Sequence, residues 1–134
     1  MTGRLIPVAA LLALAACSAP PASCPAPLRP ATEVHLYFGR EIAGGEVSEA
    51  EWAEFLASEV TPRFPDGLTV ADVRGQYREP TGRIARERSK LLVVVLFDAP
   101  AHLPRVRAIV DAYVKRWGQH SVFRTEHTVC AGAG

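Results

Sequence analysis

The stretch from Leu91 to Phe97, with the sequence LLVVVLF, constrains the fold more than any other part of the chain. A strand that alternates apolar and polar residues has one buried face, whereas a strand that is apolar at every position is buried on both faces. We therefore expect a central strand over residues 90–98, with a paired strand on each of its edges. A chain that contains such a strand must build a sheet around it.

Three other segments have the composition of strands. The segment 68–78 alternates Ala71, Val73 and Tyr77 with polar residues, which is typical of a strand with one buried face. Between it and the central strand, residues 79–88 contain Pro80 and Gly82 and are expected to form a long hairpin loop. The expected strands are residues 34–38, 68–78, 90–98 and 121–130.

Two helices separate these strands. The first begins at Ser48, because Ser48 and Glu51 have the spacing of a capping box and Val47 and Trp52 that of a hydrophobic staple. The second runs from Pro100 or Pro104 to Trp117, with Gly118 as its C-terminal stop.

The resulting order is strand, helix, strand, strand, helix, strand. This order predicts an α+β fold of the ferredoxin-like split βαβ type, β-α-β-β-α-β, with a four-stranded antiparallel sheet and two helices on one face. The first and third strands are expected in the centre, and residues 32–130 form one domain. Residues 131–134 are expected to be a flexible C-terminal tail.

The N-terminal segment has the pattern of a bacterial lipoprotein signal peptide. Arg4 precedes the apolar stretch 5–14, and the small residues before Cys17 suit a cleavage site. We expect residues 1–16 to be removed and Cys17 to carry palmitate as a membrane anchor. An ordinary secretory peptide, or a buried N-terminal helix, is the alternative. Because Ser18 rather than Asp follows the cysteine, the expected location is the periplasmic face of the outer membrane in the cell envelope.

Composition limits the partners of the mature chain. Residues 17–31 are rich in proline and alanine and are expected to form a tether. The whole chain has 15 Lys and Arg against 14 Asp and Glu, and Arg4 lies in the leader, so the mature chain has 14 of each. A formal net charge of zero argues against nucleic acid as a partner.

Two cysteines remain once Cys17 is assigned to the anchor. Cys24 and Cys130 lie at the two ends of the domain, and an oxidising compartment would allow them to form a disulfide. The sequence gives no distance between the two sulfur atoms, so the pairing stays open.

The open face of the sheet is the candidate ligand site. If Leu36, Val73 and Phe123 point toward the helices, the open face gathers polar side chains that suit a small anion or polar ligand, or acid–base chemistry. These residues are His35, Tyr37, Arg74, Gln76, Arg124 and Glu126, with Glu33 beside them. A plain solvated sheet face is the alternative. Because the central strand also places apolar side chains there, a homodimer formed through this face would cover them.

A basic loop is the second candidate. It comprises Arg83, Arg86, Arg88 and Lys90, and its charge suits anionic headgroups or phosphates near a membrane. A solvated loop tip is the alternative.

Motifs for catalysis and cofactors are missing from the sequence. The four histidines lack metal-ligand spacing, and the chain has no phosphate-binding loop, nucleophile elbow or dinucleotide motif. We therefore expect no cofactor and no metal, and a module that binds a small ligand or an envelope protein without catalysis. The alternatives are a small enzyme of the dimeric α+β barrel type, using His35, Tyr37 and Arg124, and a structural accessory lipoprotein.

Four segments of the chain resemble a known family: LYFG at 36–39, VSEAEW at 47–52, VTPRFPDGLTV at 60–70 and RERSK at 86–90. On these segments the chain is similar to the bacterial domain-of-unknown-function family numbered 3574, over about residues 32–130. The block 62–70 is the most specific part of the resemblance. The family often carries an export signal and has no established activity, so the resemblance implies the fold and the compartment and transfers no catalytic residue.

Overall fold

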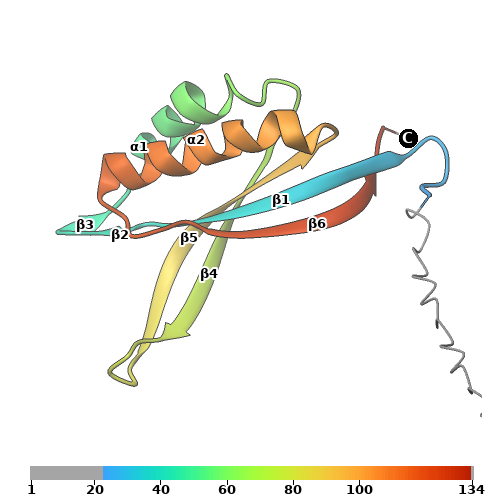
Figure 1. Ribbon diagram of the computed structural model, residues 1–134. Helices are drawn as coiled ribbons and strands as arrows, with labels where there is room; N and C mark the ends of the chain where they lie inside the picture. The colour runs from blue at the N-terminus through green and yellow to red at the C-terminus, as the bar shows by residue number, and fades with distance from the viewer. Residues whose placement is uncertain (1–22, 134) are drawn as a thin grey trace, which may run out of the picture.

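The structure is a computed structural model that describes residues 23–133 (Figure 1). Two helices lie over one face of a sheet, and one hairpin of that sheet extends past them. The elements are β1 (Arg29–Gly39), β2 (Glu41–Ile42), β3 (Gly45–Glu46), α1 (Glu49–Phe55), the π-helical turn η1 (Leu56–Val60), β4 (Thr69–Arg78), β5 (Ile84–Leu96), α2 (Ala99–Trp117) and β6 (Phe123–Ala131).

The main sheet has the strand order β4-β5-β1-β6, and every neighbouring pair is antiparallel. The two central strands are therefore the first and third long strands of the chain. This confirms the predicted α+β fold of the ferredoxin-like type. The apolar run 91–97 lies almost wholly in β5, between β4 and β1, as its composition requires.

The core lies between the sheet and the helices. Phe38 of β1 is fully buried and contacts Trp52, Phe55 and Tyr113, with ring centroids 4.7–6.1 Å apart. The Tyr113 hydroxyl donates a hydrogen bond of 2.9 Å to the carbonyl of Gly39. Burial raises the pKa of Tyr113 to about 12, so this hydroxyl is a neutral donor that ties α2 to β1.

The first helix begins as the capping box requires. The backbone N–H of Glu51 donates to the Ser48 hydroxyl at 3.2 Å, and the backbone N–H of Ser48 donates to the Glu51 carboxylate at 2.8 Å. Val47 and Trp52 are both buried beside this cap. The second helix is capped by Asp98 and stops at Gly118, whose φ of 64° favours glycine.

Two expected boundaries differ from the structure. The segment 79–88 is expected to be a loop, but β5 already begins at Ile84, which pairs with Arg78 at the end of β4. Residues 84–88 carry three charges because this part of the hairpin is exposed, and an exposed strand lacks the apolar pattern that identifies a buried one. Similarly, β1 begins at Arg29, inside the segment 17–31 expected to be a tether, because residues 29–31 pair with the end of β6.

The two ends of the domain are joined covalently. Cys24 and Cys130 form a disulfide whose Cα atoms are 5.5 Å apart. The signal peptide, Cys17 and most of the expected tether lie outside the described residues. Within residues 23–133, no helix is long and apolar enough to cross a membrane.

Candidate functional site

The strand register shows which side chains share a face. Residues that lie directly opposite each other in an antiparallel pair point to the same side. Leu36 is buried under the helices and pairs with Arg124, so Arg124 lies on the helix side of the sheet. Glu126 pairs with the buried Val34 and lies on the same side. Both residues were predicted on the open face, and both assignments are wrong.

The second strand was assigned to the wrong faces in the same way. Val70 pairs with the buried Leu92, and every second residue from Val70 onward, including Arg74 and Gln76, therefore lies on the helix side. The prediction assumed that Val73 and Phe123 point toward the helices. In the structure both side chains point away from the helices. Both belong to edge strands, where an apolar side chain can remain partly exposed outside the core. Phe123 is 68% exposed.

Two of the six predicted ligand residues do lie on the open face. His35 and Tyr37 alternate with the buried Leu36 and Phe38, and Glu33 lies beside them. The Glu33 carboxylate is hydrogen-bonded to His35 Nε2 at 2.8 Å. Next to them stand His127 and Phe123, at centroid distances of 5.5 Å from His35 and 5.8 Å from Tyr37. The open face is therefore an aromatic surface with few charges, and not the polar set that was expected.

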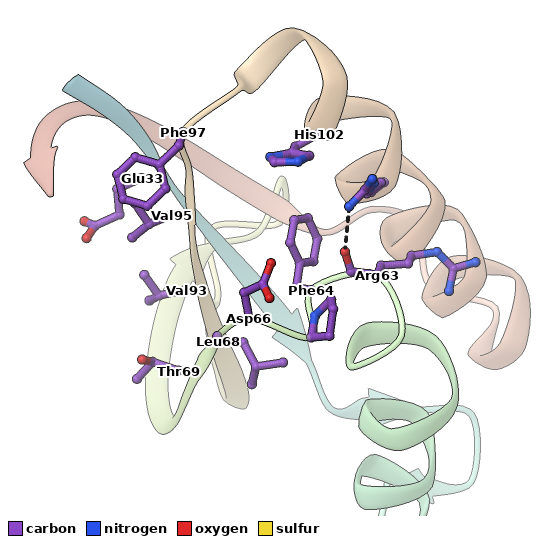
Figure 2. Close-up of a pocket in the computed structure, with 13 residues that line it drawn as sticks. Glu33, Arg63, Phe64, Asp66, Leu68, Thr69, Val93, Val95, Phe97 and His102 are labelled. Carbon is purple, nitrogen blue, oxygen red and sulfur yellow. Dashed lines mark hydrogen bonds between the residues drawn. The ribbon is translucent and has the colours of Figure 1, made fainter. Parts of the chain in front are cut away.

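A pocket lies at the edge of β5, where β4 has not yet begun (Figure 2). Pairing of the two strands starts at Thr69 and Val93, so beyond Val93 the edge of β5 faces the loop that precedes β4. The space measures about 490 Å³, which is within the range of small-molecule sites. Its apolar lining comes from the loop before β4, from β5 and from the residue that follows β5: Phe64, Leu68, Val93, Val95 and Phe97.

Polar groups also reach this pocket. Asp66 and Glu33 contribute carboxylates, while His102 and Arg105 come from the first turns of α2. The buried Nδ1 of His102 has no hydrogen-bond partner among the described residues. Arg105 donates from Nη1 to the carbonyl of Arg63, at 3.4 Å. An apolar chamber with a few converging polar groups has the makeup of a ligand site.

The pocket was missed from the sequence alone, apart from Glu33. Its lining comes from loops, a helix and three strands, and only the folded chain brings these together. One signal did point to it. The segment 62–70, the most specific part of the family resemblance, includes the pocket wall from Arg63 to Thr69.

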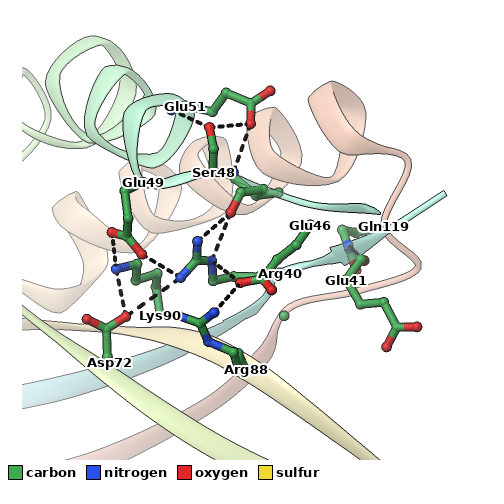
Figure 3. Close-up of polar contacts among 12 residues, drawn as sticks. Arg40, Glu41, Glu46, Ser48, Glu49, Glu51, Asp72, Arg88, Lys90 and Gln119 are labelled. Atoms are coloured by element: carbon green, nitrogen blue, oxygen red, sulfur yellow. Dashed lines mark hydrogen bonds and ion pairs between the residues drawn. The ribbon is translucent and has the colours of Figure 1, made fainter. Parts of the chain in front are cut away.

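A cluster of buried cations lies between α1 and the sheet (Figure 3). Lys90 Nζ lies 2.6 Å from Asp72 and 2.7 Å from Glu49, and Arg40 Nη1 lies 2.6 Å from Glu49. Hydrogen bonds from Lys90 hold the pKa values of Glu49 and Asp72 below their ordinary range. Burial disfavours the charge of Lys90, but hydrogen bonds to Asp72 and Glu49 outweigh burial and raise its pKa. Glu49, Asp72 and Lys90 are therefore all charged at neutral pH. Because Glu49 belongs to α1 and the other two to the sheet, their ion pairs hold α1 on the sheet.

The predicted basic loop does not exist as one unit. Lys90 belongs to the buried cluster, and Arg83 lies in the hairpin turn, where it is paired with Glu79. Only Arg86 and Arg88 stay exposed together on β5. Strand pairing instead brings Arg74 next to them, since Arg74 lies opposite Arg88.

Metal-binding geometry is also missing within residues 23–133. No three His, Cys, Asp or Glu side chains of this part gather closely enough to hold a metal ion.

Comparisons with known proteins support the fold and identify the family. No curated protein sequence matches the chain. A phage SAM lyase in complex with S-methyl-5'-thioadenosine is similar in structure, with a TM-score of 0.55, 16% identity, and coverage of 75% of this chain and 90% of that chain. The apo phage SAM lyase matches with a TM-score of 0.56 and 13% identity, covering 77% and 86%. At these identities the likeness shows a shared fold. The family model described as "Protein of unknown function (DUF3574)" matches residues 33–132, and the chain therefore belongs to this family.

Proposed function

We propose that the protein is a lipid-anchored module of the bacterial cell envelope that binds a small ligand in the pocket at the edge of β5, without catalysis. The pocket is the observation that carries the proposal, because it combines about 490 Å³ of space with apolar walls and a few polar groups. The anchor rests on the sequence pattern that ends at Cys17. It predicts that metabolically supplied palmitate labels the chain and that Cys17→Ser abolishes the label.

The lining indicates the kind of ligand. Phe64, Val95 and Phe97 offer apolar and aromatic surface to an apolar or aromatic body. Asp66 can accept hydrogen bonds and His102 can donate or accept one, so a polar group at one end of the ligand would complete the site. The phage SAM lyase, which has a similar fold, is described in complex with S-methyl-5'-thioadenosine, and a ligand of that size suits this pocket.

A neutral apolar dye tests the pocket. We expect N-phenyl-1-naphthylamine to bind the wild-type protein with a fluorescence increase, and Val95→Glu to weaken this binding at least fivefold because a carboxylate then enters the apolar chamber. Val95 is 37% exposed, so the variant should fold. Thr128→Glu is the control, because it places the same charge at an exposed position on the helix side of β6, outside the pocket lining. Equal losses in both variants, or binding unchanged by Val95→Glu, would overturn the proposal.

We also propose that a second copy of the chain covers the open face. Four strands about 4.8 Å apart, each about nine residues long at about 3.3 Å per residue, give roughly 570 Å² per copy and roughly 1,100 Å² per dimer, enough for a specific interface. The charged strand residues of this face, within the described part, are Arg29, Glu33 and Glu87. The aromatic residues Tyr37 of β1 and Phe123 of the edge strand β6 offer apolar contact area on this face, and the charges on the face are few.

Light scattering tests the dimer. We expect the wild-type protein to have twice the mass of the chain and Phe123→Asp to halve that mass, because an aspartate would be buried without a partner. Thr128→Asp adds the same charge to the opposite side of β6 and should leave the mass unchanged. A wild-type monomer would end this proposal and leave the pocket proposal intact.

A further inference from the structure

Three arginines lie together on one face of the β4–β5 hairpin. Arg74 lies opposite Arg88, and Gln76 lies opposite Arg86, so the four side chains share a face. We call this set the arginine face. The hairpin extends past both helices (Figure 1), and all four residues are exposed.

Acidic residues balance this charge only in part. Arg88 lies 3.4 Å from Glu46, but Arg74 and Arg86 take part in no ion pair within residues 23–133. Glu87 turns to the opposite side of the hairpin, where its carboxylate lies so close to Gly39 that a Cβ there would be 2.9 Å from Oε2. The arginine face therefore keeps an excess of positive charge.

Three arginines on one face destabilise the β4–β5 hairpin when no anion is bound to them. Like charges directly opposite each other on two strands repel and destabilise the pair. Between the arginines lies a depression of about 480 Å³, bordered by Arg74, Gln76, Arg86 and Arg88 together with Gly75 and Glu87, so one acidic residue borders it beside three arginines. An anion in the depression would offset the repulsion between the arginine side chains and would fill the space between them.

We infer that the arginine face binds a phosphate group. Guanidinium groups donate two parallel hydrogen bonds to phosphate oxygens, and the Gln76 amide adds a neutral donor beside them. Two sources supply this chemistry: the headgroup of an anionic phospholipid and a soluble phosphate compound. The site is separate from the pocket at the edge of β5 and does not depend on what that pocket binds.

Pyrophosphate and vesicles separate the two sources. The purified protein would be titrated with pyrophosphate, and separately with vesicles of phosphatidylglycerol or of phosphatidylcholine. The test variant is Arg74→Gln with Arg86→Gln. The control is Arg107→Gln with Lys115→Gln, which removes the same charge from exposed positions of α2.

We expect the test variant to lose at least tenfold in affinity for one of the two anionic probes and the control to change less than twofold. A loss in pyrophosphate binding assigns the site to soluble phosphates. A loss confined to phosphatidylglycerol, with phosphatidylcholine unaffected, assigns it to headgroups. Failure of the wild-type protein to bind either anionic probe, or equal losses in test variant and control, would overturn the inference.

Discussion

The domain without its disulfide is expected to be less stable by about 2–4 kcal/mol. The Cys24–Cys130 bond spans 106 residues, so it restricts nearly the whole unfolded chain, and loop-closure entropy for a loop of about 100 residues gives an upper value of about 4.7 kcal/mol. The expected result is a lower unfolding midpoint in urea for the double variant Cys24→Ser with Cys130→Ser, with a steeper slope because the unfolded chain without the bond exposes more surface.

Reduction provides the control for this experiment. A thiol reductant should lower the midpoint of the wild-type protein toward that of the double variant and should not change the double variant. If the reductant has no effect on the wild-type midpoint, the two cysteines do not stabilise the domain as the structure indicates.

Arg40→Met is expected to destabilise the domain by about 2–3 kcal/mol. The Arg40 side chain is 4% exposed, and its Nε and Nη2 donate to the carbonyl of Val47 at 2.9 and 2.6 Å. Methionine occupies a similar volume but leaves this buried carbonyl without those donors and removes the ion pair with Glu49. The free energy of unfolding, from urea titration, measures the change.

Arg88→Met is the matched control. Arg88 contacts Glu46, the same carboxylate that Arg40 contacts, but its side chain is 57% exposed. Water can replace this contact, so the expected loss is below about 1 kcal/mol. Similar losses in the two variants would mean that burial of Arg40 does not determine the strength of the cluster.

The fold was predictable because its signals are local. The apolar run 91–97 located the central strand, and Ser48 with Glu51 located the start of the first helix. Strand order then followed from the alternation of elements. Each of these signals lies within one segment of the chain, so no knowledge of distant contacts was needed.

The faces of the edge strands were not predictable in this way. Alternation shows that two sets of side chains point in opposite directions, but it does not show which set faces the core. In β1 the buried set is marked by three large apolar residues, and His35 and Tyr37 were placed correctly. In β6 the apolar Phe123 lies on the open face, and the rule that apolar residues point inward gave the wrong answer.

The pocket and the arginine face depend on contacts between distant segments. His102 approaches Phe64 only because α2 packs beside the loop before β4, at a ring distance of 6.3 Å. Arg74 meets Arg88 only because of the register of the β4–β5 hairpin, in which residues 84–88 form a strand and not the expected loop. Residue types alone indicate that this region is basic, but they do not show which residues of the two strands lie opposite each other.

The position of the disulfide also determines how the domain would carry mechanical load. Any pull from a membrane attachment upstream of Cys24 enters the domain at that residue, and the bond passes the force directly to the end of β6. Because the start of β1 pairs with the end of β6, the bond fastens both strands at the same end, so the pull would act on the two strands together and would not peel β1 from β6 one hydrogen bond at a time.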